Sequence, residues 1–279
     1  MPIKITFGNF KGGVGKTTNS VMSAYELARK GYKVLVCDLD PQANSTQLLS
    51  RTYYAQNNDT LTMNKSMMVA IQEEDLKSAV VEIMDNLFLL PSNKDFVSYP
   101  DFLELLFPAT KDRTHKEQRI SYFNDLLKNI EDDYDYIIFD VPPTLSVFTD
   151  TALFSSNNIM IVLQTQQRSL DGAEAFAEYL QTMYDTYDDI DIDIAGVLPV
   201  LMKNDSRMDN QIITDSEERF GKEALFEVVI KHMERLKRYD RLGIHEEGFT
   251  EVFDMHDKKV HEVYSEFVDE LIKRTTEGE

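Results

Sequence analysis

The chain has 279 residues, 42% of them hydrophobic, and carries 49 acidic against 29 basic residues, for a net charge of −20. This length and apolar content can fill one large core, so we expect a single domain over residues 1–279. The composition excludes several classes of protein. No run of eighteen apolar residues predicts a membrane span, no charged-then-apolar leader precedes the first strand pattern, and one cysteine, Cys37, excludes an intrachain disulfide. We therefore expect a soluble, cytoplasmic protein.

The first segment combines a strand pattern, a glycine-rich loop and a helix pattern. Ile3, Ile5 and Phe7 alternate with polar residues, and apolar residues recur at helical spacing from Val21 until Gly31. Backbone amides of the glycines between them can approach phosphate oxygens, a lysine adds a cation, a threonine hydroxyl suits Mg²⁺, and the helix N-terminus favours an anion. A plain glycine-rich turn would not need that lysine and threonine. The predicted phosphate-binding loop comprises Lys11, Gly12, Gly13, Val14, Gly15, Lys16, Thr17 and Thr18.

A second apolar run, residues 34–36, ends in two acidic residues. Asp38 and Asp40 fall at the carboxyl end of this predicted strand, where ligands bind in open parallel sheets. Carboxylates there can orient a water molecule or hold hydrated Mg²⁺, which suits metal-assisted hydrolysis. The alternative is that one or both cap a helix near Gln42.

A third apolar strand lies within residues 134–143 and ends in Asp140 and a diproline. Residues 86–93, 159–164 and 192–201 are further strand candidates, separated by segments long enough for helices. The sequence therefore predicts an α/β fold with a doubly wound, mostly parallel sheet flanked by helices.

Residues 51–86 and 96–120 are the least regular parts of the chain. The second of them holds apolar residues at helical spacing, which favours core packing over the alternative of a partner-binding patch. These residues are Phe102, Leu105, Leu106 and Phe107.

Basic residues gather in two places in this acidic chain, and a nucleic-acid surface would require such a local excess. The alternative is a solvated helix face with ion pairs. The candidate DNA-binding residues are Lys203 and Arg207 in the first place, and Lys231, Arg235, Lys237, Arg238 and Arg241 in the second.

Residues 11–18 resemble the deviant Walker A box of the ParA/MinD family of dimeric ATPases, because Phe10 replaces the usual first glycine and Lys11 adds a second lysine. Residues 34–45 resemble the Walker A′ segment of ParA proteins and residues 134–143 resemble Walker B. Residues 86–93 and the Ala195-Gly196 pair also resemble ParA sequences. Nitrogenase reductase shares the box but holds an iron–sulfur cluster with more thiolates than this chain has.

The resemblance implies roles for individual residues. Lys11 would contact the nucleotide of the other subunit in a homodimer, and Lys16 would contact the phosphates of ATP or ADP. Asp40 would position the attacking water. Thr17, Asp38 and Asp140 are the candidate Mg²⁺ ligands, with Asp140 acting through water and Asp38 supporting the switch. The adenine pocket is expected near Met202 to Asp205 and after Val229.

The resemblance further implies a slow, Mg²⁺-dependent DNA-partition ATPase without an N-terminal helix-turn-helix arm. It would be a nucleoid-associated protein that dimerises with ATP, binds DNA nonspecifically and responds to a centromere-binding (ParB-like) partner. One alternative is a MinD-like membrane-cycling regulator, but the polar face of the last predicted helix is acidic, so we expect that helix to pack on the core and no membrane partner. A bacterial tyrosine kinase would need a tyrosine-rich tail. A replication or copy-control switch remains the other alternative.

Overall fold

The computed structural model describes residues 1–111, 113–203, 207–248 and 253–276. The strands in these residues are β1 Ile3–Gly8, β2 Val34–Asp38, β3 Val81–Met84, β4 Leu87–Leu90, β5 Tyr136–Asp140, β6 Asn158–Gln164, β7 Asp193–Met202 and β8 Ile230–Lys231. The α-helices are α1 Lys16–Arg29, α2 Asn44–Asn57, α3 Met67–Gln72, α4 Tyr99–Leu106, α5 Thr114–Leu127, α6 Val147–Ser155, α7 Gln167–Thr186, α8 Arg207–Phe220, α9 Glu234–Leu242 and α10 Met255–Thr276. Short 3₁₀ helices are η1 Leu76–Ala79, η2 Lys94–Ser98, η3 Glu131–Asp133 and η4 Lys222–Ala224.

The strands form one sheet in the order β3-β4-β2-β5-β1-β6-β7-β8. Every neighbouring pair is parallel except the β3–β4 pair at one edge. Because the chain winds outward from β1 in both directions, the carboxyl ends of β1, β2 and β5 meet at one edge of the sheet. The predicted doubly wound, mostly parallel sheet is confirmed.

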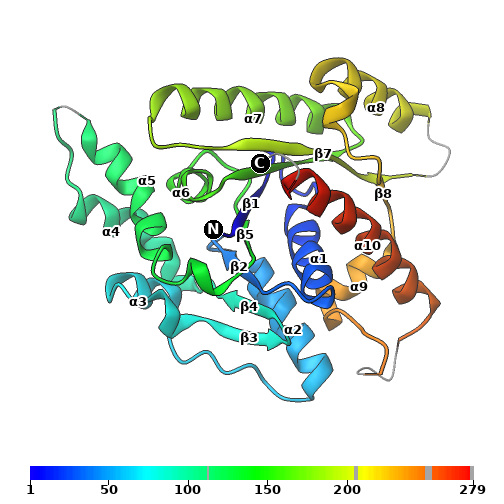
Figure 1. The fold of residues 1–279 in the computed structure, drawn as a ribbon, viewed down its shortest axis with the longest axis horizontal. Coiled ribbons are helices and arrows are strands. Elements are labelled where there is room, and N and C mark those ends of the chain that lie inside the picture. Colours follow the sequence, from blue (N-terminus) through cyan, green and yellow to red (C-terminus); the bar gives the residue numbers. More distant parts are fainter. Residues whose placement is uncertain (112, 204–206, 249–252, 277–279) are drawn as a thin grey trace.

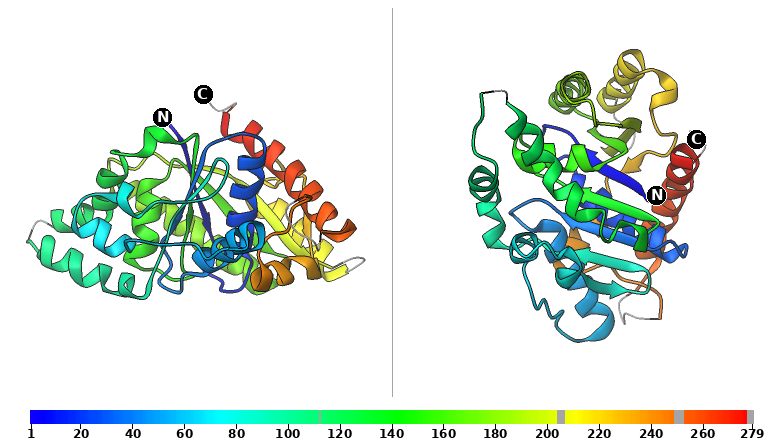
Figure 2. Two further views of the ribbon diagram at one scale, coloured as in Figure 1. Left: turned by 90° about the horizontal axis from the view of Figure 1, so that it is seen from below. Right: turned by 60° about the vertical axis from the view of Figure 1, so that its left-hand side comes forward.

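Helices cover both faces of the sheet, so the side chains of each strand, which point alternately to the two faces, enter two separate clusters. In β2, Val34 and Val36 contact the hydrophobic cluster beneath α1, α9 and α10, while Leu35 and Cys37 contact the cluster beneath α3, α4 and α5. A third cluster lies between the sheet and α7. The layers of helices on the two faces are visible in Figures 1 and 2.

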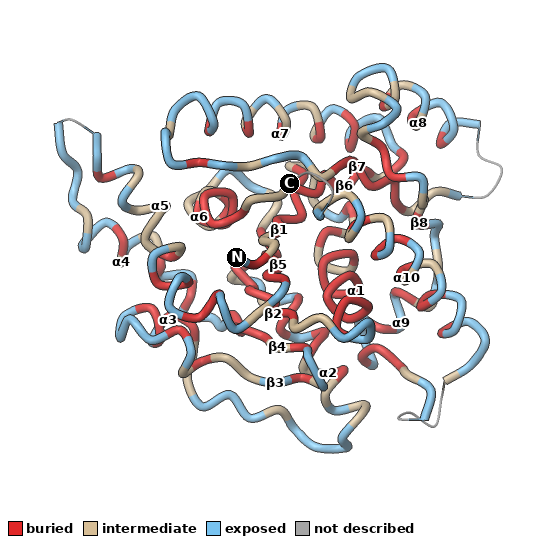
Figure 3. Tube along the Cα trace, in the orientation of Figure 1, coloured by how far each residue is buried: buried red, intermediate tan, exposed pale blue. Residues whose placement is uncertain are grey.

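Helix α1, which carries the end of the phosphate loop, is buried almost along its whole length (Figure 3). It lies between the sheet and α10, and the Tyr264 hydroxyl of α10 donates a hydrogen bond of 2.9 Å to Asn19 Oδ1 of α1. Val260, Phe267 and Leu271 of α10 are fully buried. The predicted core-packing role of α10 is confirmed. No helix among the described residues is long and apolar enough to cross a membrane.

The least regular stretches of the sequence form structure that the sequence analysis did not predict. Residues 51–86 include the rest of α2, helix α3 and the antiparallel edge strand β3. Helices α4 and α5 project at one end of the molecule (Figures 1 and 2). The apolar group there divides: Phe102 and Phe107 pack beside Tyr122, whereas Leu105 and Leu106 are exposed.

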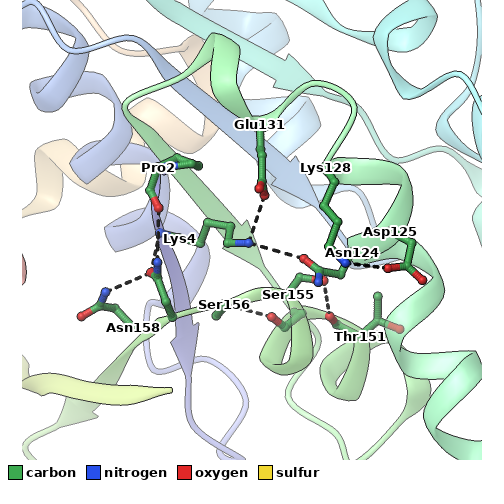
Figure 4. A network of polar contacts seen from close by, with 12 residues as sticks. Pro2, Lys4, Asn124, Asp125, Lys128, Glu131, Thr151, Ser155, Ser156 and Asn158 are labelled. Carbon is green, nitrogen blue, oxygen red and sulfur yellow. Dashed lines mark hydrogen bonds and ion pairs between the residues drawn. The ribbon is translucent and has the colours of Figure 1, made fainter. Parts of the chain in front are cut away.

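The first residues of β1, at the end of the strand away from the phosphate loop, are held by side chains from neighbouring segments. Lys4 Nζ contacts Glu131 Oε2 at 3.0 Å and Asn124 Oδ1 at 3.4 Å (Figure 4). The backbone amide of Lys4 donates to Asn157 Oδ1 at 2.7 Å. Since these side chains come from three other segments, the strand that carries the loop begins at a fixed point.

Helices α2 and α9 pack closely where α9 ends. Gly243 follows α9 with φ +84°, and a Cβ there would lie 2.5 Å from the backbone carbonyl atoms of Arg51. The next amide, of Ile244, donates to Thr52 Oγ1 of α2 at 3.0 Å. Glycine is required at position 243 both for its positive φ and for this close approach.

This packing predicts a difference between two glycine substitutions. Gly31, after α1, has φ +94° but its Cβ would meet nothing within 4 Å. Gly31→Ala should therefore lower the free energy of unfolding by about 1–2 kcal/mol from backbone strain alone. Gly243→Ala should cost about 1–3 kcal/mol more, because its Cβ overlaps backbone that cannot rotate away. Urea unfolding of both variants measures the difference, and equal costs would contradict the close packing of α2 and α9.

Candidate functional site

The phosphate loop leaves the end of β1 and enters α1 with the backbone geometry that its glycines permit. Gly13 has φ +74° and Gly15, the residue that precedes α1, has φ +92°. Asn19 Nδ2 donates to the Gly15 carbonyl at 2.7 Å. The loop therefore enters the helix through a residue in the left-handed conformation. The first amides of α1, as in any α-helix, have no intrahelical partners and can bind an anion.

Asn9, which the sequence analysis did not single out, attaches this loop to its neighbours. Its buried side-chain amide donates to the carbonyls of Val162 in β6 and Ser169 in α7, at 2.8 and 3.1 Å. Its Oδ1 accepts from the Lys11 amide at 2.8 Å. A Cβ on Gly172 of α7 would lie 2.7 Å from the same Oδ1, so only glycine at this position lets α7 approach the loop so closely.

Lys16 points back over the loop. Its ammonium group donates to the carbonyl oxygens of Asn9 and Lys11 at 3.0 and 3.3 Å, and the residue is only 6% exposed. Burial lowers the pKa of Lys16 to about 8, and the nearby charges of Asp140 and Asp40 oppose this shift. An anion in the loop would supply the negative charge that this buried cation lacks.

Asp38 and Asp140 lie side by side, paired in register at the ends of β2 and β5, and both are fully buried. Burial raises the pKa of both carboxyl groups. Asp38 Oδ2 accepts from the amide and the hydroxyl of Thr46 at 2.8 and 2.7 Å, and its Oδ1 accepts from the Asp40 amide at 3.2 Å. Asp38 therefore caps the start of α2, as the alternative interpretation proposed for one of the two acids.

Asp140 differs because one of its oxygens remains available. Oδ2 accepts from Ser45 Oγ at 2.5 Å, while the buried Oδ1 has no hydrogen-bond partner among the described residues. The Thr17 hydroxyl acts on the same carboxyl group and lowers its pKa against the larger effect of burial. An unpartnered carboxylate oxygen beside a hydroxyl fits Mg²⁺, which takes few protein ligands and completes its shell with water and phosphate oxygens.

Thr17 and Asp140 thus fit the predicted metal site, whereas both oxygens of Asp38 are already engaged. The described residues contain no cluster of three or more His, Cys, Asp or Glu side chains suited to a metal ion. This is consistent with an ion held mainly by a phosphate-bearing ligand rather than by a protein cage.

Asp40 faces the same space as Lys16. Its Oδ1 accepts from the Gln42 amide at 2.9 Å, and burial raises its pKa while Lys16 opposes the shift. The space is a cavity of about 580 Å³, which is within the range of small-molecule sites. Its lining comprises Gly13, Gly15, Lys16, Thr17, Thr18, Asp40, Gln42, Asn44, Gln47, Leu48, Arg51, Val141, Pro143 and Asp240.

Two expected parts of the nucleotide site lie outside this cavity. The Lys11 side chain lies beside Gly172 of α7, its ammonium makes no hydrogen bond or ion pair within the described part of the chain, and Lys11 does not line the cavity. In the expected adenine segment, Met202 and Lys203 do not line it, and Asp205 lies outside the described residues. Asp240, which lines the cavity, belongs to the segment after Val229 that was also expected to hold adenine, although no side chain was named there. Arg51, which lines it too, was not predicted.

The two groups of basic residues lie on adjacent structure. Strands β7 and β8 pair at Met202 and Lys231, so Lys203 follows directly from a residue paired with Lys231. The exposed cations at this end of the sheet and on α9 are Lys203, Arg207, Lys231, Lys237, Arg238 and Arg241, which we call the basic surface. Lys237 forms an exposed ion pair of 3.0 Å with Glu234, which costs little to break.

Arg235 corrects the expectation. Its side chain is 8% exposed, and its guanidinium contacts Asp254 at 2.5 Å and Asp257 at 3.2 Å. Two carboxylates already neutralise its charge, so Arg235 joins α9 to the start of α10 and is not presented with the other cations. Arg235 therefore agrees with the alternative interpretation of the basic residues, in which they form ion pairs.

Comparison with known proteins shows which families and structures the chain is similar to. A family model described as an AAA domain matches residues 3–194, most of the chain. An uncharacterized protein of Pseudomonas putida is 30% identical over 85% of this chain and 83% of its own length. An uncharacterized protein of Methanocaldococcus jannaschii is 30% identical over 67% of this chain and 66% of its own length. The chromosome-partitioning ATPase Soj of Treponema pallidum is 26% identical over 86% of this chain and 87% of its own length.

Solved structures share the fold. An ATP complex of a McdA variant from Cyanothece superposes with a TM-score of 0.77 at 19% identity and covers 98% of this chain and 96% of its own. A plasmid partition protein of Borrelia burgdorferi bound to AMPPNP gives 0.69 at 20% identity, over 95% and 99%. Cobyrinic acid a,c-diamide synthase of Mycobacterium smegmatis with ADP and magnesium gives 0.71 at 23% identity, over 100% and 97%.

These similarities show that the chain contains an AAA domain. Within that class, the chain belongs to the ParA/Soj-like family of partition ATPases.

The anchoring of the loop by Asn9 leads to a prediction. Asn9→Ala removes the side-chain bonds to β6, α7 and the Lys11 amide. We expect a loss of about 1–3 kcal/mol in the free energy of unfolding and a nucleotide affinity at least several-fold weaker. Urea unfolding and titration with a fluorescent ATP analogue measure the two effects. Asn158→Ala, at the opposite end of β6, is the control and should leave nucleotide affinity unchanged; equal affinities for all three proteins would contradict the role of Asn9.

Proposed function

We propose that the protein is a Mg²⁺-dependent DNA-partition ATPase whose ATP-bound homodimer binds DNA without sequence preference. The observation that carries the proposal is the convergence of Lys16, Thr17 and Asp40 on one cavity, beside the buried Asp140. These are the groups that phosphoryl transfer from ATP to water requires. The names of the Soj and Borrelia relatives support the assignment to partition.

In this proposal the loop amides and Lys16 bind the β- and γ-phosphates, and Thr17 and Asp140 hold Mg²⁺. When bound, Mg²⁺ neutralises charge on the phosphate oxygens. Lys16 would then move from the carbonyls of Asn9 and Lys11 to the phosphates. The negative charge of the phosphates would stabilise the protonated form of Lys16, which burial disfavours.

Asp40 would orient the attacking water. As the water oxygen bonds to the γ-phosphorus, the bond to the β-phosphate bridging oxygen breaks, ADP leaves and the water proton passes to Asp40 or to the released phosphate. Burial raises the pKa of Asp40, which makes it a better proton acceptor than a solvated carboxylate.

Lys11 would act across a dimer interface. Its ammonium makes no hydrogen bond or ion pair with the described residues, and Lys11 does not line the cavity of its own subunit. Reaching the nucleotide of a second copy would give ATP a direct part in joining the two subunits. The cavity walls would thus be complete only in the dimer.

The basic surface would bind the DNA backbone. It concentrates cations in a protein with net charge −20, so contact with DNA is favoured there while the rest of the molecule is repelled. Contacts to phosphate carry no sequence information. In the cell the protein would be cytoplasmic and nucleoid-associated, with a centromere-binding partner that stimulates hydrolysis.

The catalytic proposal predicts the behaviour of Asp40→Ala. The variant should bind ATP within a few-fold of the wild type, because Lys16 and the loop amides are intact, but should lose at least about 100-fold in turnover. Phosphate release measures hydrolysis, and light scattering with ATP measures dimerisation.

Two controls accompany this test. Asp59→Ala removes an exposed carboxylate from the segment after α2 and should hydrolyse ATP normally. Adding Lys11→Ala to Asp40→Ala should abolish the ATP-dependent dimer. Normal turnover in Asp40→Ala would remove Asp40 from the mechanism.

The DNA proposal predicts a change in salt dependence. Replacing Lys237, Arg238 and Arg241 together by alanine should weaken ATP-dependent binding to DNA. The slope of log affinity against log salt should fall by about 2.7, because each DNA phosphate that the protein neutralises contributes about 0.9 to that slope. Fluorescence anisotropy with duplexes of unrelated sequence measures the slope.

The matched control removes the same charge elsewhere. Lys111, Arg113 and Lys116 are exposed at the α4–α5 hairpin, and their replacement by alanine should leave the slope unchanged. If both triple variants show the same reduction in slope, net charge and not the basic surface governs DNA binding.

A further inference from the structure

Helix α2 connects the carboxylates of the site to α9, the helix that carries three cations of the basic surface. At its start, Ser45 and Thr46 hydrogen-bond Asp140 and Asp38. Further along the helix, Gln47 and Arg51 line the cavity. The same helix then contacts the segment after α9 through Thr52.

The Arg51 side chain contacts the end of α9 and also lines the cavity. Its Nη1 donates to the backbone carbonyl of Asp240, in the last turn of α9, and its Nη2 lies 3.4 Å from Gln47 Oε1. Carbonyls in the last turn of a helix have no intrahelical partner, so this contact caps α9. Arg51 and Lys16 are also the two cationic side chains that line the cavity in the described part of the chain.

The two ends of α9 are held differently. Near its start, Arg235 is bound to the carboxylates of Asp254 and Asp257. In its second half, the Tyr239 hydroxyl donates to Asp257 at 2.8 Å. At its end the attachments to α2 are the Arg51 contact, the Ile244 amide bond to Thr52 and the packing at Gly243. A change at Arg51 would therefore act on the last residues of α9, which include Arg241, while Arg235 and Tyr239 stay anchored to α10.

We propose that Arg51 is a positioning residue that couples nucleotide in the cavity to α9. Arg51 is also attracted by the Asp240 carboxylate, which lines the same cavity. A triphosphate carries more negative charge than that single carboxylate and is a stronger acceptor for a guanidinium than the neutral carbonyl is. Nucleotide therefore draws Arg51 away from Asp240, the end of α9 loosens, and Arg241, which it carries, changes position. The inference rests on the proposed function, for which it supplies the regulation of DNA binding by ATP.

Amide hydrogen exchange tests the first step without DNA. The Gly243 amide donates to the Tyr239 carbonyl at 2.8 Å and the Ile244 amide to Thr52 Oγ1 at 3.0 Å, so both report on the attachment of the end of α9. Addition of ATP and Mg²⁺ to the wild type should accelerate exchange at both amides several-fold. Burial in a dimer interface would slow exchange instead, so the sign separates the two effects.

Arg51→Met removes the guanidinium and keeps the aliphatic part of the side chain, which is exposed, so the variant should fold. Exchange at the two amides should be fast with and without nucleotide. ATP affinity should fall by no more than about tenfold, because Lys16 and the loop remain and one charge-assisted hydrogen bond is removed. Arg113→Met, on the distant α4–α5 hairpin, is the control and should match the wild type in every measurement.

Three results would overturn the inference: slower or unchanged exchange in the wild type with ATP, a normal nucleotide response in Arg51→Met, or complete loss of ATP binding in that variant, which would make Arg51 a simple ligand. Failure of the proposed function looks different. A wild type that never binds DNA refutes DNA partition, but the exchange experiment still decides whether nucleotide reaches α9 through Arg51. Thr52→Val removes the acceptor of the Ile244 amide outside the cavity, and should accelerate exchange at Ile244 without changing ATP affinity.

Discussion

The site depends on two carboxylates, Asp38 and Asp140, held next to each other and fully buried from solvent. Such a pair is unfavourable alone, because burial and mutual repulsion oppose its ionisation. The start of α2 relieves this cost through hydrogen bonds from Ser45 and Thr46, and Lys16 brings a positive charge nearby. The position of α2 is therefore tied to the charge of the site, and any change in that charge acts on α2.

Local patterns in the sequence predicted the central part of the structure. The alternation in β1, the glycines of the loop and the acids that end β2 and β5 each lie within a short stretch, so the sequence analysis placed Lys16, Asp40 and Asp140 at one edge of a parallel sheet. It also left open whether one acid caps a helix, which is what Asp38 does.

What the sequence did not reveal depends on partners distant in the chain. Asn9 holds residues more than 150 positions away, and Arg51 contacts a carbonyl 189 positions away. Arg235 resembled its basic neighbours until folding brought Asp254 and Asp257 to it. Edge strand β3 is short and antiparallel, and its few residues carry no periodic pattern long enough to identify.

The placement of the cations also has an effect at a distance. A strongly acidic body with positive side chains gathered at the ends of β7, β8 and along α9 is an electric dipole. Near a polyanion such a molecule experiences a torque that turns its positive pole forward before any atoms touch. The electrostatic torque acts over about 10 Å at 0.1 M salt. At physiological ionic strength it therefore orients the protein only at close range, with the positive pole toward the polyanion.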